Sequence, residues 1–491
     1  MKLTKISPFN LHLKNLYALP FVFICIFLIC ARKYVWNYFN TMTGAEFLFF
    51  IHTPIDGADK RLVHIFFNKC VLNPLIYAVL ICYAREVFFL LTQIWNKKSQ
   101  IFKFIFQVIQ YMRRYYTFWI IIISLLGSGY LLTKFKFIKD IIEMQKAPYS
   151  TFFEENFVRP SVQNISLSQK KNLIIIAVES LEKTFENKNF FGQSMLPHLE
   201  KLETEGVQFN NYTNGWNTTN TMSFVMALFA GVPKSCNYAH LINHHGNKVN
   251  LLNNYYSLGN FLNEQGYQTY AIQTSDAKYA GQGHFFETHG IQNIIDKYYI
   301  KNQFNIKAKE DEWGYNDDIL FDTAKKVLMQ RENSAPYFMF IQTIDSHVNY
   351  LPNVKDHKKF KNKYHNIIYN TNLQIYNFVL WLKTQPDYKN TVIVILGDHL
   401  RMGNNFPMPK KRQNYNLFLN VPVPQNTDRT FSQVDLLPTV LEALGAKVEN
   451  HQLGIGISVF SDRETLLEKY GNSLGSLLAK RSKLNEELWK L

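Results

Sequence analysis

The stretch that most constrains the fold of this chain is TVIVILGDH, residues 391–399. Its leading residues are mostly valine and isoleucine, which is the composition of a strand buried on both faces of a parallel sheet. The apolar run ends at Gly397 and is followed by Asp398 and His399. Because open α/β sheets build their sites at the carboxyl ends of the strands, this pair predicts half of a ligand site.

Further short apolar runs predict the other strands of the same sheet. From Asn172 onward, runs rich in isoleucine and valine alternate with amphipathic stretches, which is typical of βα units and a mainly parallel sheet. The predicted strands are residues 173–178, 269–273, 337–344 and 391–396. Three of them precede potential ligands, namely Glu179, Asp345-Ser346-His347 and Asp398-His399. One carboxylate after a strand is usually a helix cap, but three such strand ends favour a cluster.

A predicted helix with threonines at its start lies between the first two strands. In WNTTNTMSFVMALFAGVP, residues 216–233, the apolar residues have helical spacing and Gly-Val-Pro ends the helix. The hydroxyls of Thr218, Thr219 and Thr221 then lie at or near the helix N-terminus. They act either as N-caps or, for one of them, as a nucleophile, because free N–H groups and the helix dipole favour a phosphate anion.

Glutamate, aspartate, histidine and threonine side chains together suit one divalent cation with mixed oxygen and nitrogen ligation. Threonine is a poor nucleophile at neutral pH. Coordination lowers the pKa of its hydroxyl, and the same cation neutralises charge on a phosphoryl group under attack. These residues therefore predict a phospho-threonine intermediate and two successive displacements.

The N-terminal region contains apolar stretches near the length of about 20 residues that crosses a bilayer. We predict three spans, near residues 15–34, 71–95 and 115–133, and consider a fourth, shallower segment between Val35 and Ile51. Arg85 and Glu86 interrupt the second span and would have to face protein or a polar cavity. No small-x-small cleavage site closes the first span, so we expect an uncleaved anchor.

The net charge of +15 is concentrated in this region, where residues 1–170 carry 20 Lys or Arg against 8 Asp or Glu. This distribution argues against a nucleic-acid surface on the globular part and for basic loops beside a membrane. The loops before the first span and between the second and third spans are basic, and basic loops favour the cytoplasmic side. Everything after Thr133 is therefore predicted to lie outside the cytoplasm. The basic loop between the first two spans opposes this orientation. Of five cysteines only Cys236 lies in the large domain, which excludes a disulfide within it.

Residues 172–467 resemble the sulfatase-like enzymes of the alkaline-phosphatase superfamily that act in bacterial envelopes. The matching pieces occur in the family's order: NLIIIAVES, the threonine helix ending in GVP, KYAGQGHFFETHGI, EWGYNDDILFD, FIQTIDSH, VIVILGDHL and FSQVDLLPTVLEALG. Hydropathy and polarity predict membrane helices at residues 1–133 and a connector at 134–170. The resemblance implies an α/β sulfatase-like domain with a mainly parallel sheet at 171–463, and we expect a helical tail at 464–491.

The resemblance also implies roles for single residues. Glu179, Asp398 and His399 match metal ligands, and Thr218 best matches the nucleophile and fourth ligand. Thr219 is a close rival for that role and Thr221 a distant one. His347 matches a histidine that holds the substrate phosphate or assists the leaving oxygen. Trp313, Asp317 and Asp318 match another block, with a structural role expected for Trp313, and Asp345 is expected to orient His347.

The loop KYAGQGHFF favours the phosphoglycerol transferase I type within the family. Lipoteichoic acid synthases have tryptophan and arginine where this chain has Ala280 and Gln282. Phosphoethanolamine transferases usually carry several disulfides in the outer domain, whereas this domain has the single cysteine Cys236, which counts against that type. Lys278, Gln282 and His284 are therefore expected either to contact glycerol or phosphate or to form a solvated loop.

The function that follows is transfer of phosphoglycerol from phosphatidylglycerol to an envelope glycan. The chain is then expected to be a multi-pass protein of the bacterial inner membrane, with its catalytic domain facing the periplasm or the outside. One divalent cation is implied, with Mn²⁺ favoured over Zn²⁺ or Mg²⁺. The alternatives are a phosphoethanolamine transferase acting on lipid A or another glycan, a sulfatase-like hydrolase and an inactive scaffold. The hydrolase lacks the Cys/Ser-x-Pro-x-Arg motif that formylglycine formation requires. Acceptor and oligomeric state remain open.

Overall fold

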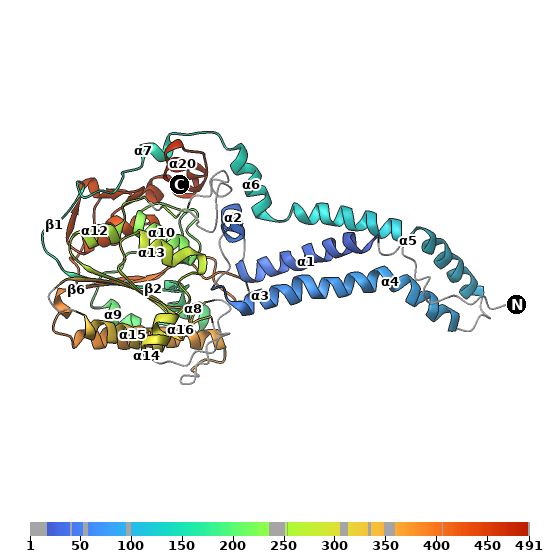
Figure 1. Ribbon diagram of the computed structural model, residues 1–491, viewed down its shortest axis with the longest axis horizontal. Helices are drawn as coiled ribbons and strands as arrows, with labels where there is room; N and C mark the ends of the chain where they lie inside the picture. Colours follow the sequence, from blue (N-terminus) through green and yellow to red (C-terminus); the bar gives the residue numbers. More distant parts are fainter. Residues whose placement is uncertain are drawn as a thin grey trace. The chain divides into compact units, whose positions relative to one another are not determined.

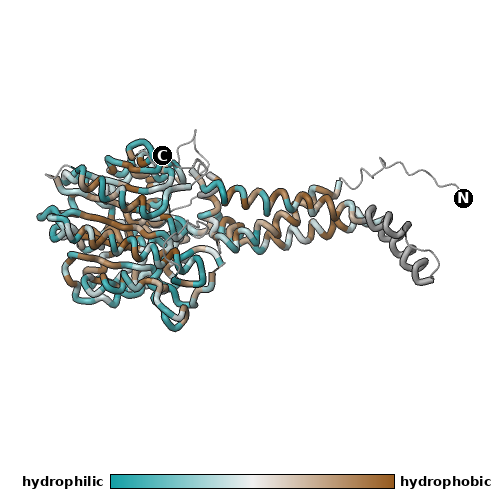
Figure 2. The backbone as a smooth tube through the Cα atoms, turned by 90° about the horizontal axis from the view of Figure 1, so that it is seen from below, coloured by the Kyte–Doolittle hydropathy of each residue, from teal (hydrophilic) through white to brown (hydrophobic). Residues whose placement is uncertain are grey.

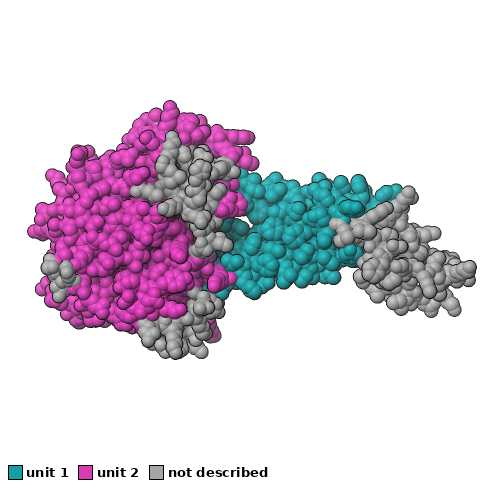
Figure 3. All heavy atoms as spheres, in the orientation of Figure 1, with its two compact units in different colours: residues 1–44, 61–140, 403–405 teal, residues 45–60, 141–402, 406–491 magenta. Residues whose placement is uncertain are grey.

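A computed structural model describes residues 17–39, 42–52, 57–94, 100–234, 251–252, 254–304, 313–331, 335–347, 359–404 and 406–489. The chain forms two compact units (Figure 3). The first comprises Met1–Gly44, Arg61–Asp140 and Gly403–Asn405, and the second comprises Ala45–Lys60, Ile141–Met402 and Phe406–Leu491. Cys236, on which the disulfide prediction depends, lies outside the described residues.

The first unit is helical and predominantly apolar (Figure 2). Its helices are α1 (Leu19–Phe39), α3 (Lys60–Phe66), the π-helix η2 (Phe67–Leu72), α4 (Asn73–Ile94), α5 (Gln100–Leu132) and the start of α6 (Lys136–Lys146). Helix α1 packs against α4 and α5 around Ala18, Val22, Ala78 and Cys82. These small and apolar residues let the helices approach closely, as is common between membrane helices.

Among the residues that the structure describes, three helical stretches are long and apolar enough to cross a membrane: Leu19–Phe39, Lys60–Ala84 and Tyr115–Leu132. The first and third lie close to the predicted spans. The second begins earlier than the predicted residue 71, because α3, η2 and α4 follow one another without a break. The side chains of Arg85 and Glu86 lie outside the described part of the chain, and the orientation across the membrane stays a prediction.

The second unit contains a six-stranded, mostly parallel sheet, which confirms the predicted fold class. Its strands, in spatial order, are β4 (Asn293–Ile295), β3 (Gln268–Gln273), β5 (Tyr337–Gln342), β2 (Asn172–Val178), β6 (Thr391–Gly397) and β7 (Asn416–Leu419), and only β7 runs antiparallel to its neighbour. Strand β2 pairs with β5 and β6, so Ile175 lies between Phe340 and Val394. The ends of these three strands therefore meet at one edge of the sheet.

Helices cover both faces of the sheet (Figure 1). Alternate side chains of β2 enter two separate cores, because successive residues of a strand point to opposite faces. One face packs against α10 (Thr221–Ala230), α12 (Leu258–Glu264), α13 (Gln282–Thr288) and α17 (Leu436–Ala443). The other packs against α9 (Leu199–Glu203), α14 (Lys297–Phe304), α15 (Asp317–Gln330) and α16 (Lys363–Lys383).

The connector and the C-terminal segment join each other beside this core. The connector contains α7 (Phe152–Glu155) and β1 (Ile165–Leu167), and β1 pairs antiparallel with β8 (Ala446–Val448). The C-terminal segment contains α18 (Leu466–Tyr470), α19 (Leu474–Leu478) and α20 (Lys483–Leu488). Glu154 accepts hydrogen bonds from the Ser482 hydroxyl and the Leu484 N–H, so the two segments hold each other.

The predicted shallow membrane segment between Val35 and Ile51 is divided between the two units. Helix α1 ends at Phe39, and α2 (Gly44–His52) belongs from Ala45 onward to the second unit. Helix α2 is therefore part of the unit that contains the sheet, although it lies between candidate membrane helices in the sequence.

Candidate active site

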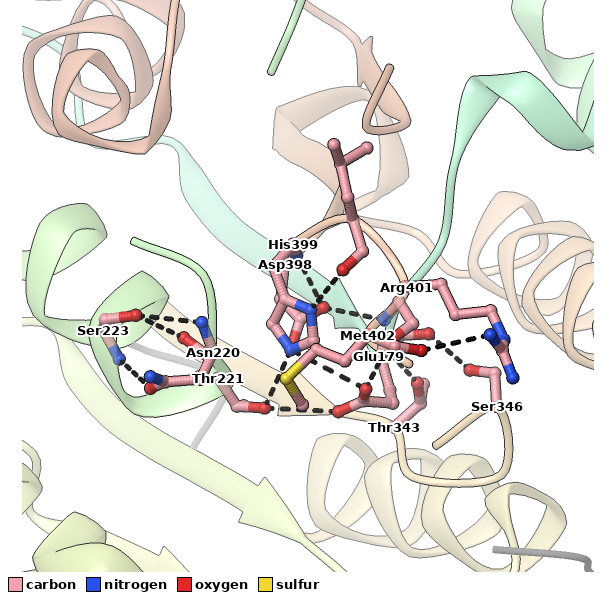
Figure 4. Close-up of polar contacts among 12 residues, drawn as sticks. Glu179, Asn220, Thr221, Ser223, Thr343, Ser346, Asp398, His399, Arg401 and Met402 are labelled. Atoms are coloured by element: carbon pink, nitrogen blue, oxygen red, sulfur yellow. Dashed lines mark hydrogen bonds and ion pairs between the residues drawn. The ribbon is translucent and has the colours of Figure 1, made fainter. Parts of the chain in front are cut away.

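Three buried side chains form a cluster at the carboxyl edge of the sheet (Figure 4). Glu179 follows β2, and Asp398 and His399 follow the neighbouring strand β6. One ligand atom of each residue lies within 4.8 Å of the other two. His399 Nε2 lies 3.4 Å from Asp398 Oδ2 and 3.7 Å from Glu179 Oε1. The structure thus brings together three of the four predicted metal ligands, and Thr218 is not among them.

The side chains of the cluster fit a divalent cation. Asp398 Oδ1 accepts hydrogen bonds from the N–H groups of Ser180 and His399, at 2.8 and 2.7 Å. Asp398 Oδ2 is buried and accepts no hydrogen bond from the described part of the chain. A buried carboxylate oxygen without a hydrogen-bond partner is costly unless a cation or proton compensates it. Two carboxylates and one imidazole are also a common donor set for such metals.

The charges within the cluster shift the pKa values of its members. Burial raises the pKa of the Asp398 carboxyl to about 7, against the opposing effect of His399. Burial lowers the pKa of His399, but the carboxylates of Asp398 and Glu179 raise it above its ordinary value. Burial would also raise the pKa of Glu179, yet His347 and His399 hold it below its ordinary value. Binding a cation therefore has to displace protons from this cluster.

Neighbouring polar groups fix the orientation of the cluster. The Ser180 hydroxyl donates to Glu179 Oε1 at 2.6 Å, and the Glu179 N–H donates to the Thr343 hydroxyl at 3.0 Å. His399 Nδ1 lies 3.0 Å from the carbonyl oxygen of Leu400. A proton on Nδ1 directed at this carbonyl leaves Nε2 as the atom available to a ligand.

Thr221 is the threonine that reaches the cluster. Asn220 caps α10 and forms a capping box with Ser223, so Thr221 is the first residue of the helix. Its hydroxyl lies 3.2 Å from Glu179 Oε2 and 3.5 Å from His399 Nε2 (Figure 4). The hydroxyl is thus held between two of the three clustered side chains at a helix N-terminus, where an anion is favoured.

The structure places Thr218, the predicted nucleophile and fourth ligand, outside this cluster. Its hydroxyl donates to the Gly215 carbonyl at 3.0 Å and to Gln433 Oε1 at 2.7 Å, rather than joining the cluster. Gln433 Nε2 in turn donates to Asn214 Oδ1 and to the Asp398 carbonyl, both at 3.1 Å. Thr218 and Gln433 therefore tie the loop before α10 to the strand end that carries Asp398.

Replacing Thr218 by valine should test this structural role. The isosteric change removes a buried donor from Gln433 and should lower the free energy of unfolding by about 1–2 kcal/mol. Metal content should stay at the wild-type level, because Thr218 is not in the cluster. Thermal unfolding and metal analysis of the purified full chain would check this. Loss of metal at unchanged stability would restore Thr218 as a ligand.

His347 lies beside the cluster without being one of its three members. Its charge acts on Glu179, and its ring contacts the Trp313 ring edge-on with centroids 4.7 Å apart. Trp313 therefore packs on the histidine that follows β5. The Asp317 carboxylate accepts the N–H groups of Ile344 and Asp345, which turns the chain out of the sheet after Gln342. This turn ends β5 two residues before the predicted Ile344.

The three residues of the predicted substrate loop have different surroundings. The Lys278 side chain is exposed, while its N–H donates to Asp276 Oδ1. Gln282 is buried, and its amide donates to Gln342 Oε1 at 2.5 Å, which links the loop to the end of β5. His284 is half-buried. Substrate contact by these residues stays a prediction.

Sequence reasoning missed Glu46 of α2. Glu46 is 8% exposed, and its carboxylate accepts a hydrogen bond from the hydroxyl of Thr219, two residues before Thr221. The signal in the sequence is a single acidic residue in the apolar run GAEFLFFIH. Ionisable residues within apolar segments are costly and commonly functional, but the composition of this stretch also fits the shallow membrane segment considered between Val35 and Ile51.

Known proteins resemble this chain in both sequence and fold. A phosphoglycerol transferase I from Citrobacter koseri is 26% identical over 373 residues, which covers 72% of this chain and 47% of that protein. The chain thus spans about half the length of the curated relatives it matches.

Two solved structures share the fold. One is a protein in the alkaline phosphatase superfamily from Vibrio parahaemolyticus, with a TM-score of 0.51, 20% identity, and coverage of 65% of this chain and 79% of that chain. The other is the lipoteichoic acid synthase LtaP from Listeria monocytogenes, with a TM-score of 0.51, 18% identity, and coverage of 63% and 81%. The model of the sulfatase family matches residues 171–446, which include the clustered side chains and Thr221. The chain belongs to the sulfatase family.

Proposed function

We propose that this chain is a metal-dependent phosphotransferase that moves phosphoglycerol from phosphatidylglycerol to an envelope glycan through phospho-Thr221. The observation that carries the proposal is the Thr221 hydroxyl, held against Glu179 and His399 at the start of α10. The similarity to phosphoglycerol transferase I supports the group that is transferred.

In the first displacement, the Thr221 oxygen attacks the phosphorus of the donor lipid. A bond forms between this oxygen and phosphorus, and the bond from phosphorus to the diacylglycerol oxygen breaks. The proton that Thr221 gives up is balanced by the proton that diacylglycerol takes up as it leaves. His347 lies beside the cluster and is our candidate for handling the leaving oxygen.

In the second displacement, a hydroxyl of the glycan attacks the same phosphorus. The bond from phosphorus to Thr221 breaks, and the threonine regains its proton while the glycan hydroxyl loses one. Free N–H groups at the start of α10 favour the anionic group throughout. Water in place of the glycan hydroxyl would give hydrolysis instead of transfer.

The cluster of Glu179, Asp398 and His399 would hold the cation, with Thr221 as a fourth ligand. When bound, the cation lowers the pKa of the threonine hydroxyl and neutralises charge on the phosphoryl group. We favour Mn²⁺, with Zn²⁺ and Mg²⁺ as the alternatives that the same donors accept.

The apolar helices support a membrane donor. Three stretches are long and apolar enough to span a bilayer, and a catalytic unit tethered to them meets a bilayer lipid at high effective concentration. We place the catalytic unit on the outer side of the inner membrane, because the basic loops favour that orientation.

The donor can be tested with the purified full chain and labelled lipids. Phosphatidylglycerol should release diacylglycerol at least tenfold faster than phosphatidylethanolamine, because the chain resembles the phosphoglycerol transferase I type. Release only from phosphatidylethanolamine would replace the proposed donor with that of a phosphoethanolamine transferase. Free glycerol phosphate in place of a glycan product would identify a hydrolase.

A further inference from the structure

Helix α2 brings a residue from between two candidate membrane spans into the unit that contains the site. In the sequence, α2 lies between Leu19–Phe39 and Lys60–Ala84. Residues Ala45–Lys60 nevertheless belong to the same compact unit as the sheet. This segment therefore cannot be removed with the membrane helices without changing the catalytic unit.

The first contact of this segment is with the loop that leads to Thr221. The Thr219 hydroxyl donates to Glu46 Oε1, and the Glu46 carboxylate is buried. Glu46 is thus in contact with a residue two positions before the proposed nucleophile.

The second contact is with the loop that follows β3. Gly57 has φ +78°, and a Cβ added there would lie 2.9 Å from Asp276 Cβ. The backbone of this turn therefore approaches Asp276 closely. Asp59 is 4% exposed, and burial together with the charges of Asp59 and Glu179 raises the pKa of Tyr279 to about 12. The segment is thus held at two loops of the site.

We propose that Glu46 is a positioning residue, which holds Thr219 and thereby the loop that presents Thr221 to the cluster. Thr221 touches the cluster directly, whereas Glu46 acts on it through Thr219. The inference rests on the proposed function, in which the Thr221 oxygen attacks phosphorus. An error of about 1 Å in the position of a reacting group can cost about 100-fold in rate, so a hydrogen bond that fixes this loop has a measurable effect.

The kinetic test compares Glu46→Gln with Glu46→Ala in the purified full chain, with phosphatidylglycerol as donor. Glutamine keeps an oxygen that accepts from Thr219, whereas alanine does not. Glu46→Ala should lower kcat about 10- to 100-fold with little change in KM, and Glu46→Gln should stay within about threefold of wild type. Equal losses in both variants would mean that the negative charge matters instead, and would overturn the proposal.

A double-mutant cycle tests whether Glu46 acts through Thr219. Thr219→Val should lower kcat as much as Glu46→Ala, and the double variant should lose no more than either single one. Losses that multiply would show that the two residues act independently. Full activity in Glu46→Ala would show that Glu46 positions nothing, and either result would overturn the proposal. Metal content should equal that of wild type in all of these variants, because neither residue belongs to the cluster.

A cross-link tests the placement of α2 independently of any catalysis by the protein. Glu46→Cys combined with Thr219→Cys should be joined by a short bismaleimide cross-linker, identified by peptide mass, because the two native side chains are in contact. Gly57→Ala should reduce the yield of this cross-link, while Gly192→Ala should not, because Gly192 has a similar φ of +81° but open space around it. Absence of the 46–219 cross-link would refute the placement. A cross-link with no diacylglycerol release from wild type would refute the proposed function alone.

Discussion

Replacing Thr221 by alanine should abolish phosphoglycerol transfer and the covalent intermediate together. The Thr221 hydroxyl is the threonine oxygen in contact with both Glu179 and His399, so no other threonine at the helix start takes its place in the described structure. Removing the nucleophile of a covalent mechanism commonly costs about three to six orders of magnitude in kcat. We expect diacylglycerol release to fall by at least 1,000-fold.

Intact-mass measurement after incubation with phosphatidylglycerol provides the direct readout. Wild type should gain the mass of one phosphoglyceryl group, and Thr221→Ala should gain none. Thr218→Val is the matched control, since it removes a hydroxyl of the same loop that faces Gln433 instead of the cluster. Persistence of the adduct in Thr221→Ala together with its loss in Thr218→Val would return the nucleophile to Thr218. Thr221→Ser should retain an adduct, because serine keeps the attacking oxygen.

The sheet and its strand-end ligands could be predicted because each depends on local sequence. A strand buried on both faces needs a continuous apolar run, and β2, β5 and β6 are such runs. Once these strands are parallel, the residues that follow them must meet at one edge. The strand ends favour a cluster that contains Glu179, Asp398 and His399, and the family resemblance singles these three out as metal ligands. The structure brings them within 4.8 Å.

Counting back from the Gly-Val-Pro stop does not show which threonine hydroxyl faces the cluster. Which hydroxyl faces the cluster depends on where α10 begins, and the capping box of Asn220 and Ser223 places that start at Thr221. The sequence NTMS carries this signal, because asparagine is a strong N-cap. The partner that withdraws Thr218, Gln433, lies 215 residues away in the sequence. No local pattern predicts such a contact.

Glu46 was missed for a different reason. Hydropathy assigns an apolar segment to a membrane or to a protein core by composition, and α2 is short enough for either. Only the contacts with Thr219 and the loop after β3 distinguish the two. An acidic residue in such a segment is best treated as a candidate for a site until its environment is known.

Replacing Asp398 by asparagine should remove the metal while leaving the fold intact. Asparagine keeps an oxygen for the N–H groups of Ser180 and His399, which now bond to Asp398 Oδ1. It replaces Oδ2, which accepts no hydrogen bond from the described residues, by an amide that cannot bind a cation. Metal analysis should show near-complete loss, and transfer should fall by at least 100-fold. Full metal content in Asp398→Asn would exclude the cluster as the metal site.

The same variant should change stability in opposite directions with and without metal. With Mn²⁺ at 100 times its Kd, the free energy of unfolding of wild type should rise by about 2.7 kcal/mol, which Asp398→Asn cannot gain.

With a chelator, burial raises the pKa of Asp398 to about 7 in the folded protein, above its value of about 4 when unfolded. The ionised carboxylate then destabilises the folded state above pH 7, and this penalty disappears as the pH falls toward 4. Chelated Asp398→Asn should therefore be more stable than chelated wild type at pH 8, by up to about 4 kcal/mol, and similar to it at pH 4. Thermal unfolding at both pH values, with and without Mn²⁺, distinguishes a metal ligand from a residue that only supports the fold. If Asp398 only supports the fold, Asp398→Asn should be less stable than wild type under all four conditions.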